Sequence, residues 1–210
     1  KNDIEEFKTL KEFYLEELDK LNEEYINNVR NKKSEKEEKN WCKLKELKKV
    51  SSTYKKQIND LDLKERQKPL TPKQKDLLQL YLLSLLYTLI PPMRLDYNVI
   101  IKSNEKDLNK NENYLINKSK FKKYFLIQDY KTSESNGSKK IDLPKEIVSA
   151  INLWLRFNKT GFLFINNRNE RQSENGLGKM ITKAFSPTGK KVSLNLLRKI
   201  FVSENINKTE

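Results

Sequence analysis

The chain has 210 residues, and its 43 Lys and Arg against 29 Asp and Glu give a formal net charge of +14. It has no His and a single Cys, Cys42, which excludes the usual zinc sites, an internal disulfide and catalysis by a Ser-His-Asp or Cys-His pair. The longest apolar run, near residues 77–93, is interrupted by polar residues and prolines, and the first residues predict no signal peptide. We therefore expect a soluble, basic, intracellular protein.

The positive charge is concentrated in the second part of the chain. Residues 1–66 hold 17 Lys or Arg and 16 Asp or Glu, whereas residues 67–210 hold 26 and 13. A surplus of this size indicates a polyanionic partner such as nucleic acid. The alternative is a solubility surplus from Asn- and Lys-rich codon usage, but such usage would load both parts alike. A membrane surface is less favoured, because the basic residues are spread over several expected elements.

The first 66 residues predict a charged helical arm or hairpin. Apolar residues recur every three or four positions over residues 3–30, which predicts a long helix with a charged opposite face. Residues 31–40 form a polar break, and a second helix is expected over residues 41–60. We assign this region, residues 1–66, no chemistry, and we place the domain boundary near residues 66–70.

The remaining residues, 67–210, predict helices around a small antiparallel sheet. Thr71 and Pro72 form a helix start, and the helix that follows is apolar almost all round, so we expect a central core helix that ends before Pro91. Strands are expected at residues 97–102, 114–116, 123–130 and 139–143, a short strand or turn at 161–165, and helices at 145–157, at 173–185 and after Ser193. This order favours an α+β, mostly helical fold.

Three positions are candidates for chemistry because of their place in these elements. Arg94 follows the core helix in the sequence PPMRLDY, where the prolines fix the backbone. Lys131 lies where the clearest strand enters its hairpin loop. Arg198 lies on the last helix, and Asn195 is one turn before it on the same face. Each residue alone is most often a solvated or salt-bridged surface residue, and Asp96 can simply be an ion-pair partner of Arg94.

Together, the segments PPMRLDY, YKTS…GSKKIDLP, GFLF and VSLNLLRKIFVSE resemble the catalytic domain of tyrosine recombinases, the phage-integrase family. The resemblance covers residues 70–206 and is closest in character to integrases of large eukaryotic DNA viruses and virophages. It implies a tyrosine-recombinase-like α+β catalytic domain behind the helical arm. It also implies double-stranded DNA as the partner, a tetramer on paired sites, a viral protein acting in a host cell, and no metal or other cofactor.

The resemblance implies a role for each matching residue. Arg94 and Arg198 match the two arginines that clamp the scissile phosphate, a task that suits planar, permanently charged guanidinium groups. Lys131 matches the hairpin lysine that protonates the departing 5′ oxygen. Asn195 stands where the family usually has His, and its amide can bind a phosphate oxygen but cannot accept a proton. Asp96 is a candidate substitute for the family's acidic support residue. Lysines expected to contact DNA are Lys139, Lys140, Lys190, Lys191 and Lys199.

The family's nucleophile is a Tyr several helical turns beyond the second Arg, and the chain has no match for it. All nine tyrosines lie at or before Tyr130, and none follows Arg198 up to Glu210. We therefore expect the catalytic domain to be truncated before its nucleophile segment. Such a chain would bind DNA without forming a covalent adduct.

Three functions remain open at this point. The first is a site-specific recombinase or integrase that cleaves and rejoins duplex DNA through a 3′-phosphotyrosine intermediate. The second is a type IB topoisomerase-like enzyme, which uses nearly the same chemistry without pairing sites, although the last helix resembles the integrases more. The third is a non-enzymatic, basic DNA-binding protein.

Overall fold

The computed structural model describes residue 20 and residues 33–206, so the long helix expected over residues 3–30 lies outside the described residues except for its helical position 20. The chain divides into two compact units, Lys1–Asn40 and Trp41–Glu210. In the first unit, helix α2 (Glu35–Asn40) occupies part of the segment for which we predicted a polar break. Its first turn is rich in Glu, and Ser34 Oγ accepts a hydrogen bond from the Glu37 backbone (3.3 Å), so a capped acidic start explains the helix.

In the second unit, helix α3 (Leu44–Asp60) packs against helix α4 (Pro72–Leu89). The apolar side of α3, including Leu47 and Ile58, is fully buried in the core of this unit. Helix α3, which we assigned to the arm of residues 1–66, therefore belongs to the same compact unit as α4. An amphipathic helix buries its apolar face against whatever core lies next to it, and here that core includes α4.

Helix α4 begins as the sequence predicts. Thr71 Oγ1 accepts a hydrogen bond from the Gln74 backbone (3.3 Å), and Gln74 Oε1 accepts one from the Thr71 backbone (3.0 Å). This reciprocal pair is a capping box, and a proline occupies the first helical position directly after Thr71. The helix ends before Pro91 and is buried along most of its length, which confirms the expected central core helix.

The sheet has four strands in the order β1–β2–β3–β4. The strands are β1 (Ile100–Lys102), β2 (Tyr114–Asn117), β3 (Lys123–Ile127) and β4 (Lys139–Asp142). β2 with β3 and β3 with β4 pair antiparallel, as expected, but β1 pairs parallel with β2. The long polar connection between β1 and β2 allows this, because it returns the chain to the end where β1 began. The mostly helical α+β class is confirmed.

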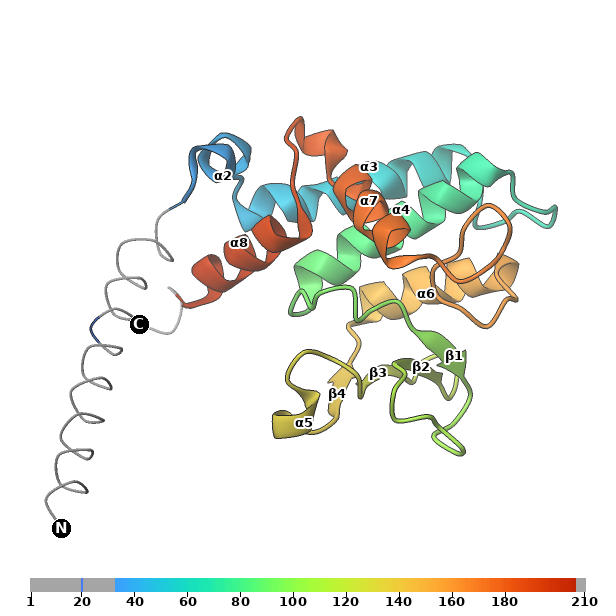
Figure 1. Ribbon diagram of the computed structural model, residues 1–210. Coiled ribbons are helices and arrows are strands. Elements are labelled where there is room, and N and C mark those ends of the chain that lie inside the picture. Colours follow the sequence, from blue (N-terminus) through green and yellow to red (C-terminus); the bar gives the residue numbers. More distant parts are fainter. Residues whose placement is uncertain (1–19, 21–32, 207–210) are drawn as a thin grey trace, which may run out of the picture. The chain divides into compact units, whose positions relative to one another are not determined.

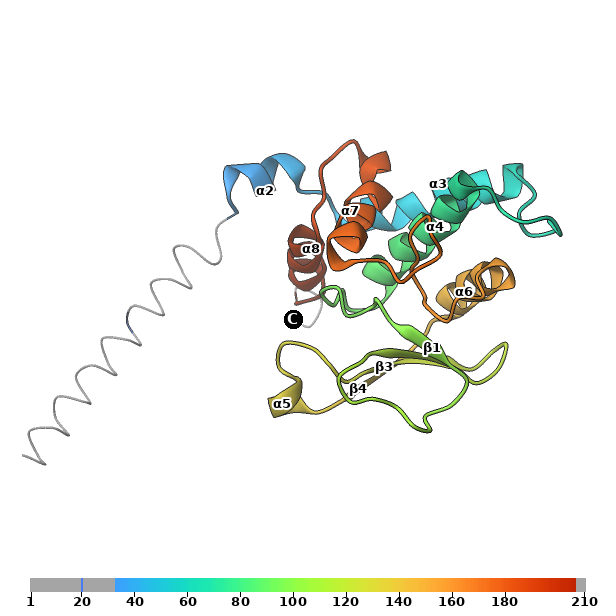
Figure 2. The same cartoon turned by 45° about the vertical axis from the view of Figure 1, so that its right-hand side comes forward.

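The remaining helices complete the second unit. They are α5 (Ser133–Asn136), α6 (Lys145–Phe157), α7 (Glu174–Ala184), the 3₁₀ helix η2 (Ser186–Thr188) and α8 (Leu194–Ile206). Helices α4, α6, α7 and α8 lie to one side of the sheet in both views, and α5 lies within the β3–β4 hairpin (Figures 1 and 2). Among the described residues, no helix combines the length and apolar character needed to cross a membrane.

Candidate functional site

An open cavity of about 630 Å³ lies where three loops of the second unit meet. The loops are the one after α4, the start of the β3–β4 hairpin and the one before α7. The lining residues with charged side chains are Arg94, Asp96, Asp129, Lys131, Arg171 and Glu174. The structure therefore brings Lys131 of the β3–β4 hairpin to the same cavity as Arg94 and Asp96, which share the loop after α4.

Two buried tyrosines hold the loop that carries Arg94. The Tyr87 hydroxyl donates a hydrogen bond to the Arg94 carbonyl (2.7 Å), and the Tyr97 hydroxyl donates one to the Pro91 carbonyl (2.6 Å). Burial raises the pKa of both tyrosines above its ordinary value, so both hydroxyls remain proton donors. The exposed Arg94 side chain thus starts from a fixed backbone position. The prolines alone predicted part of this constraint, whereas the tyrosines were missed.

Asp96 links the two arginines electrostatically. Burial raises the pKa of this carboxyl above its ordinary value of 3.8, and the neighbouring Asp129 adds to the increase. Three contacts oppose the increase: a hydrogen bond from the Arg94 backbone and the charges of the Arg94 and Arg198 guanidinium groups. Arg198 is not a lining residue, but it acts on the same carboxyl as Arg94.

Replacing Asp96 by Asn is expected to raise the free energy of unfolding at pH 7. The folded-state pKa of Asp96 is raised, so as the pH rises through 3.8 the carboxyl ionises first in the unfolded chain, which lowers the stability of the fold. Asn cannot ionise in either state, and the gain should disappear well below pH 3.8. Urea unfolding over a series of pH values measures this difference. Asp60→Asn, at the exposed end of α3, is the control. An equal effect of Asp96→Asn at low and neutral pH would contradict the assignment.

The backbone that leads to Lys131 is held by one buried side chain. Asn113 Oδ1 accepts hydrogen bonds from the backbone N–H groups of Gln128 (2.8 Å) and Asp129 (2.9 Å). Its Nδ2 donates to the Asp129 carbonyl (2.7 Å). This clamp ties the end of β3 to the start of β2, so the exposed Lys131 side chain extends from a defined position at the cavity.

Arg171 is a lining residue that the sequence analysis missed. Its Nη1 lies 2.8 Å from Glu112 Oε2, and its Nη2 donates a hydrogen bond to the Asn98 carbonyl (2.6 Å). Of the three buried side-chain polar atoms without a hydrogen-bond partner among the described residues, two belong to Asn98 and Arg171. A buried polar atom without a partner in the protein calls for a partner from outside it, and both of these residues line the cavity. Arg171 lies in a polar loop without periodicity, and no sequence pattern marks it.

Arg198 and Asn195 lie on the first turns of α8. Ser193 Oγ accepts a hydrogen bond from the Leu196 backbone (3.3 Å) at the start of the helix, as the sequence predicts. Leu197 is buried in the core, which fixes the rotation of the helix. Arg198 is half-buried, whereas Asn195 is exposed, and within the described part of the chain Asn195 does not line the cavity.

The five lysines that we expect to contact DNA lie in different parts of the second unit. Lys139 and Lys140 are exposed on β4, and Lys199 is exposed on α8. Lys191 lines a neighbouring hollow of about 570 Å³ that shares Leu95 and Glu174 with the main cavity.

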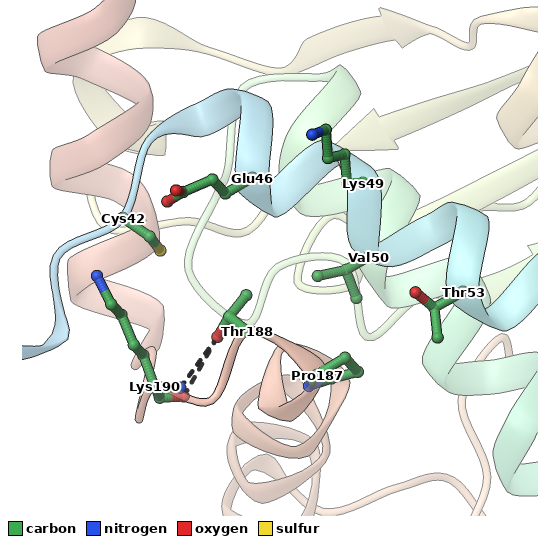
Figure 3. A pocket seen from close by; sticks show the side chains of 8 residues that line it. All are labelled: Cys42, Glu46, Lys49, Val50, Thr53, Pro187, Thr188 and Lys190. Atoms are coloured by element: carbon green, nitrogen blue, oxygen red, sulfur yellow. Dashed lines mark hydrogen bonds between the residues drawn. The ribbon is translucent and has the colours of Figure 1, made fainter.

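Lys190 is separated from this group. It lines a different pocket of about 270 Å³, together with Cys42 and Thr188 (Figure 3). Its backbone N–H donates a hydrogen bond to Thr188 Oγ1 (3.2 Å), and its ammonium donates one to the Trp41 carbonyl. Burial raises the pKa of the Cys42 thiol. The structure thus gives Lys190 a contact with the segment before α3.

The main cavity combines cations with hydrogen-bonded supports, which suits an oxyanion ligand. Guanidinium groups bind two oxygens of a phosphate at once, and an ammonium group can bind one oxygen or donate a proton. Although Asp96, Asp129 and Glu174 line the same cavity, no group of three or more carboxylate or thiol side chains within the described residues could hold a metal ion.

No protein-family model and no curated protein matches the chain. The chain is similar to the crystal structure of XerA recombinase, with 16% sequence identity and a TM-score of 0.46 over 85% of this chain. It spans 50% of the length of that structure.

Proposed function

We propose that this chain binds a backbone phosphate of duplex DNA in the cavity of Arg94 and Lys131. It acts as the phosphate-activating part of a DNA strand transferase of the tyrosine recombinase class, and assembly as a tetramer on paired sites belongs to the same proposal. One observation carries it: Arg94 and Lys131, from separate elements, line one cavity, and Arg198 acts on the Asp96 carboxyl of that cavity. The formal net charge of +14 supports a polyanionic partner.

The proposed chemistry assigns one task to each cation. An oxygen nucleophile attacks the phosphorus, and the bond from phosphorus to the 5′ oxygen breaks. Arg94 and Arg198 bind the non-bridging oxygens, which gain negative charge in the pentacovalent transition state. The Lys131 ammonium gives its proton to the departing 5′ oxygen. In this class the nucleophile is a tyrosine, and the intermediate is a 3′-phosphotyrosine.

DNA binding by the chain is expected to weaken steeply with salt. Each phosphate contact lowers the slope of log affinity against log salt by about 0.9. Arg94→Ala and Lys131→Ala should each make this slope shallower by up to about 0.9, because both side chains are proposed to contact phosphate. Fluorescence anisotropy of a labelled duplex at several salt concentrations measures the slopes.

The matched control is Arg168→Ala. Arg168 is exposed, and its neighbour Asn169 accepts a hydrogen bond from Lys75 Nζ (2.7 Å) in the first turn of α4. That end of α4 is opposite to the end that leads to Arg94, so Arg168 lies outside the cavity. Unchanged slopes for Arg94→Ala and Lys131→Ala, or a slope reduced equally by Arg168→Ala, would contradict the proposed phosphate site.

A further inference from the structure

The turn between β2 and β3 carries an unusually exposed aromatic side chain. Phe121 is 82% exposed, more than any other large apolar residue in the described part of the chain. It lies in the sequence NKSKFKK, with Lys118, Lys120 and Lys122 close to it. All three lysines are exposed. A large apolar side chain surrounded by cations indicates a surface that takes a partner with both apolar and anionic parts.

This turn is held rigidly although its tip is exposed. Ser119 Oγ accepts hydrogen bonds from the backbone N–H groups of Phe121 (3.3 Å) and Lys122 (3.1 Å). Lys123, only 4% exposed, donates from Nζ to the carbonyls of Ser119 (2.6 Å) and Lys120 (3.2 Å). Asn152 of α6 also donates to the Lys120 carbonyl (2.8 Å). The backbone below Phe121 is therefore organised before any partner binds, which lowers the entropic cost of binding.

Cations, without an exposed aromatic ring, continue along the sheet around the buried Tyr124 side chain (1% exposed). The Tyr124 ring has Lys140 Nζ at 4.1 Å and Lys118 Nζ at 5.4 Å from its centroid. Glu105 offsets part of this charge, because it lies 3.6 Å from Lys118. Lys140 belongs to β4, so the cations extend from the turn across two strands.

The turn and the cavity lie at opposite ends of β3. From the turn, the chain enters β3 and leaves it at the hairpin that carries Lys131. The eight residue steps from Lys123 to Lys131 span at most about 26 Å in an extended strand. Duplex DNA rises about 3.4 Å per base pair, so a duplex along the strand places the turn up to roughly eight base pairs from the bound phosphate.

We propose that the turn Lys118–Lys123 is a second DNA contact, in which Phe121 enters the minor groove and stacks on bases while the flanking lysines bind phosphates. This inference rests on the proposed DNA binding. Apolar side chains on rigid segments are used in this way to wedge base steps, and lysines supply the phosphate contacts. An anionic lipid surface also attracts lysines and aromatic rings, but a single Phe buries little apolar area for membrane binding. The row of cations that runs toward the cavity fits a duplex better.

The test compares a short duplex that covers only the cavity with a longer duplex that also reaches the turn. Phe121→Ala should weaken binding of the longer duplex roughly five- to 150-fold, the range for loss of one aromatic–base stack, and leave the short duplex unaffected. The salt slope should not change, since no charge is removed. Lys120→Ala and Lys122→Ala should each reduce the slope by about 0.9 on the longer duplex. Leu61→Ala, another exposed apolar side chain (47% exposed), is the matched control.

The outcomes separate this inference from the proposed function. If the wild-type chain binds neither duplex, the proposed function fails and this inference fails with it. If Phe121→Ala binds the longer duplex as tightly as wild type, only the second contact is overturned. Phe121→Trp should retain the affinity, and its fluorescence should change on binding of the longer duplex. Phe121-dependent binding to phosphatidylserine vesicles, with Phe121-independent DNA binding, would assign the turn to a lipid surface instead.

Discussion

Arg94→Ala and Arg198→Ala are each expected to slow DNA strand cleavage by about 10²–10³-fold while weakening DNA binding only several-fold. The difference arises because the guanidinium groups bind charge that develops in the transition state, whereas ground-state affinity is shared by many phosphate contacts. Cleavage is followed with hydrogen peroxide as an added small nucleophile. The peroxide replaces the tyrosine that this class uses as its nucleophile, because all nine tyrosines of the chain lie at or before Tyr130. The Tyr130 hydroxyl, at the cavity, donates a hydrogen bond to the Gly137 carbonyl (2.9 Å).

Arg168→Ala serves as the control for loss of an exposed arginine outside the cavity, and it should cleave at the wild-type rate. Wild-type rates for Arg94→Ala and Arg198→Ala would remove both residues from the chemistry. A wild-type chain that binds duplex DNA but gives no peroxide-dependent cleavage would favour the remaining alternative, a basic DNA-binding protein without strand-transfer activity.

Lys131→Ala is expected to lower the rate of DNA cleavage by a factor that depends on the leaving group. On ordinary duplex DNA the rate should fall by about 10²–10⁴-fold, the usual contribution of a general acid. On a duplex with sulfur at the bridging 5′ position, the rate should stay near that of wild type, because a thiolate leaves without a proton. Paired rate measurements on the two substrates give the ratio directly.

Lys131→Arg is the informative companion variant. Arginine keeps the positive charge at the cavity but does not give up its proton in proteins. The Lys131→Arg variant should therefore retain DNA affinity. It should cleave ordinary DNA slowly and cleave the sulfur-containing substrate at a rate near that of wild type. Equal slowing of Lys131→Ala on both substrates would show that Lys131 contributes charge alone and is not the acid.

Local signals account for the elements that could be predicted. Thr71 and Gln74 form a capping box, Pro91 stops α4, and Ser193 begins α8, because these effects act within a few residues. The β3–β4 hairpin follows from a strand pattern and a turn-rich segment. These elements fix the backbone positions of Arg94 and Lys131. The order of these residues along the chain resembles that of the tyrosine recombinase family, and this resemblance selected two residues that line one cavity.

Long-range contacts account for what was missed. Tyr87 and Asn113 look like ordinary core and loop residues in the sequence, and their roles depend on a carbonyl or backbone segment supplied by the fold. Arg171 reaches the cavity only because its loop folds back against Asn98. The same reasoning explains why the packing of α3 on α4 was not predicted, since the burial of α3 depends on its tertiary partner and not on its own periodicity.

Binding of orthovanadate, an analogue of phosphate, tests most directly whether the cations converge on one anion. Vanadium NMR line widths, titrated against the chain without DNA, should reveal one saturable site. Arg94→Ala, Lys131→Ala and Arg198→Ala should each weaken that site, and Arg168→Ala should leave it unchanged. If vanadate binds equally well to any one of the three cavity variants, that cation does not reach the common anion, and the account of a single phosphate-activating site is contradicted.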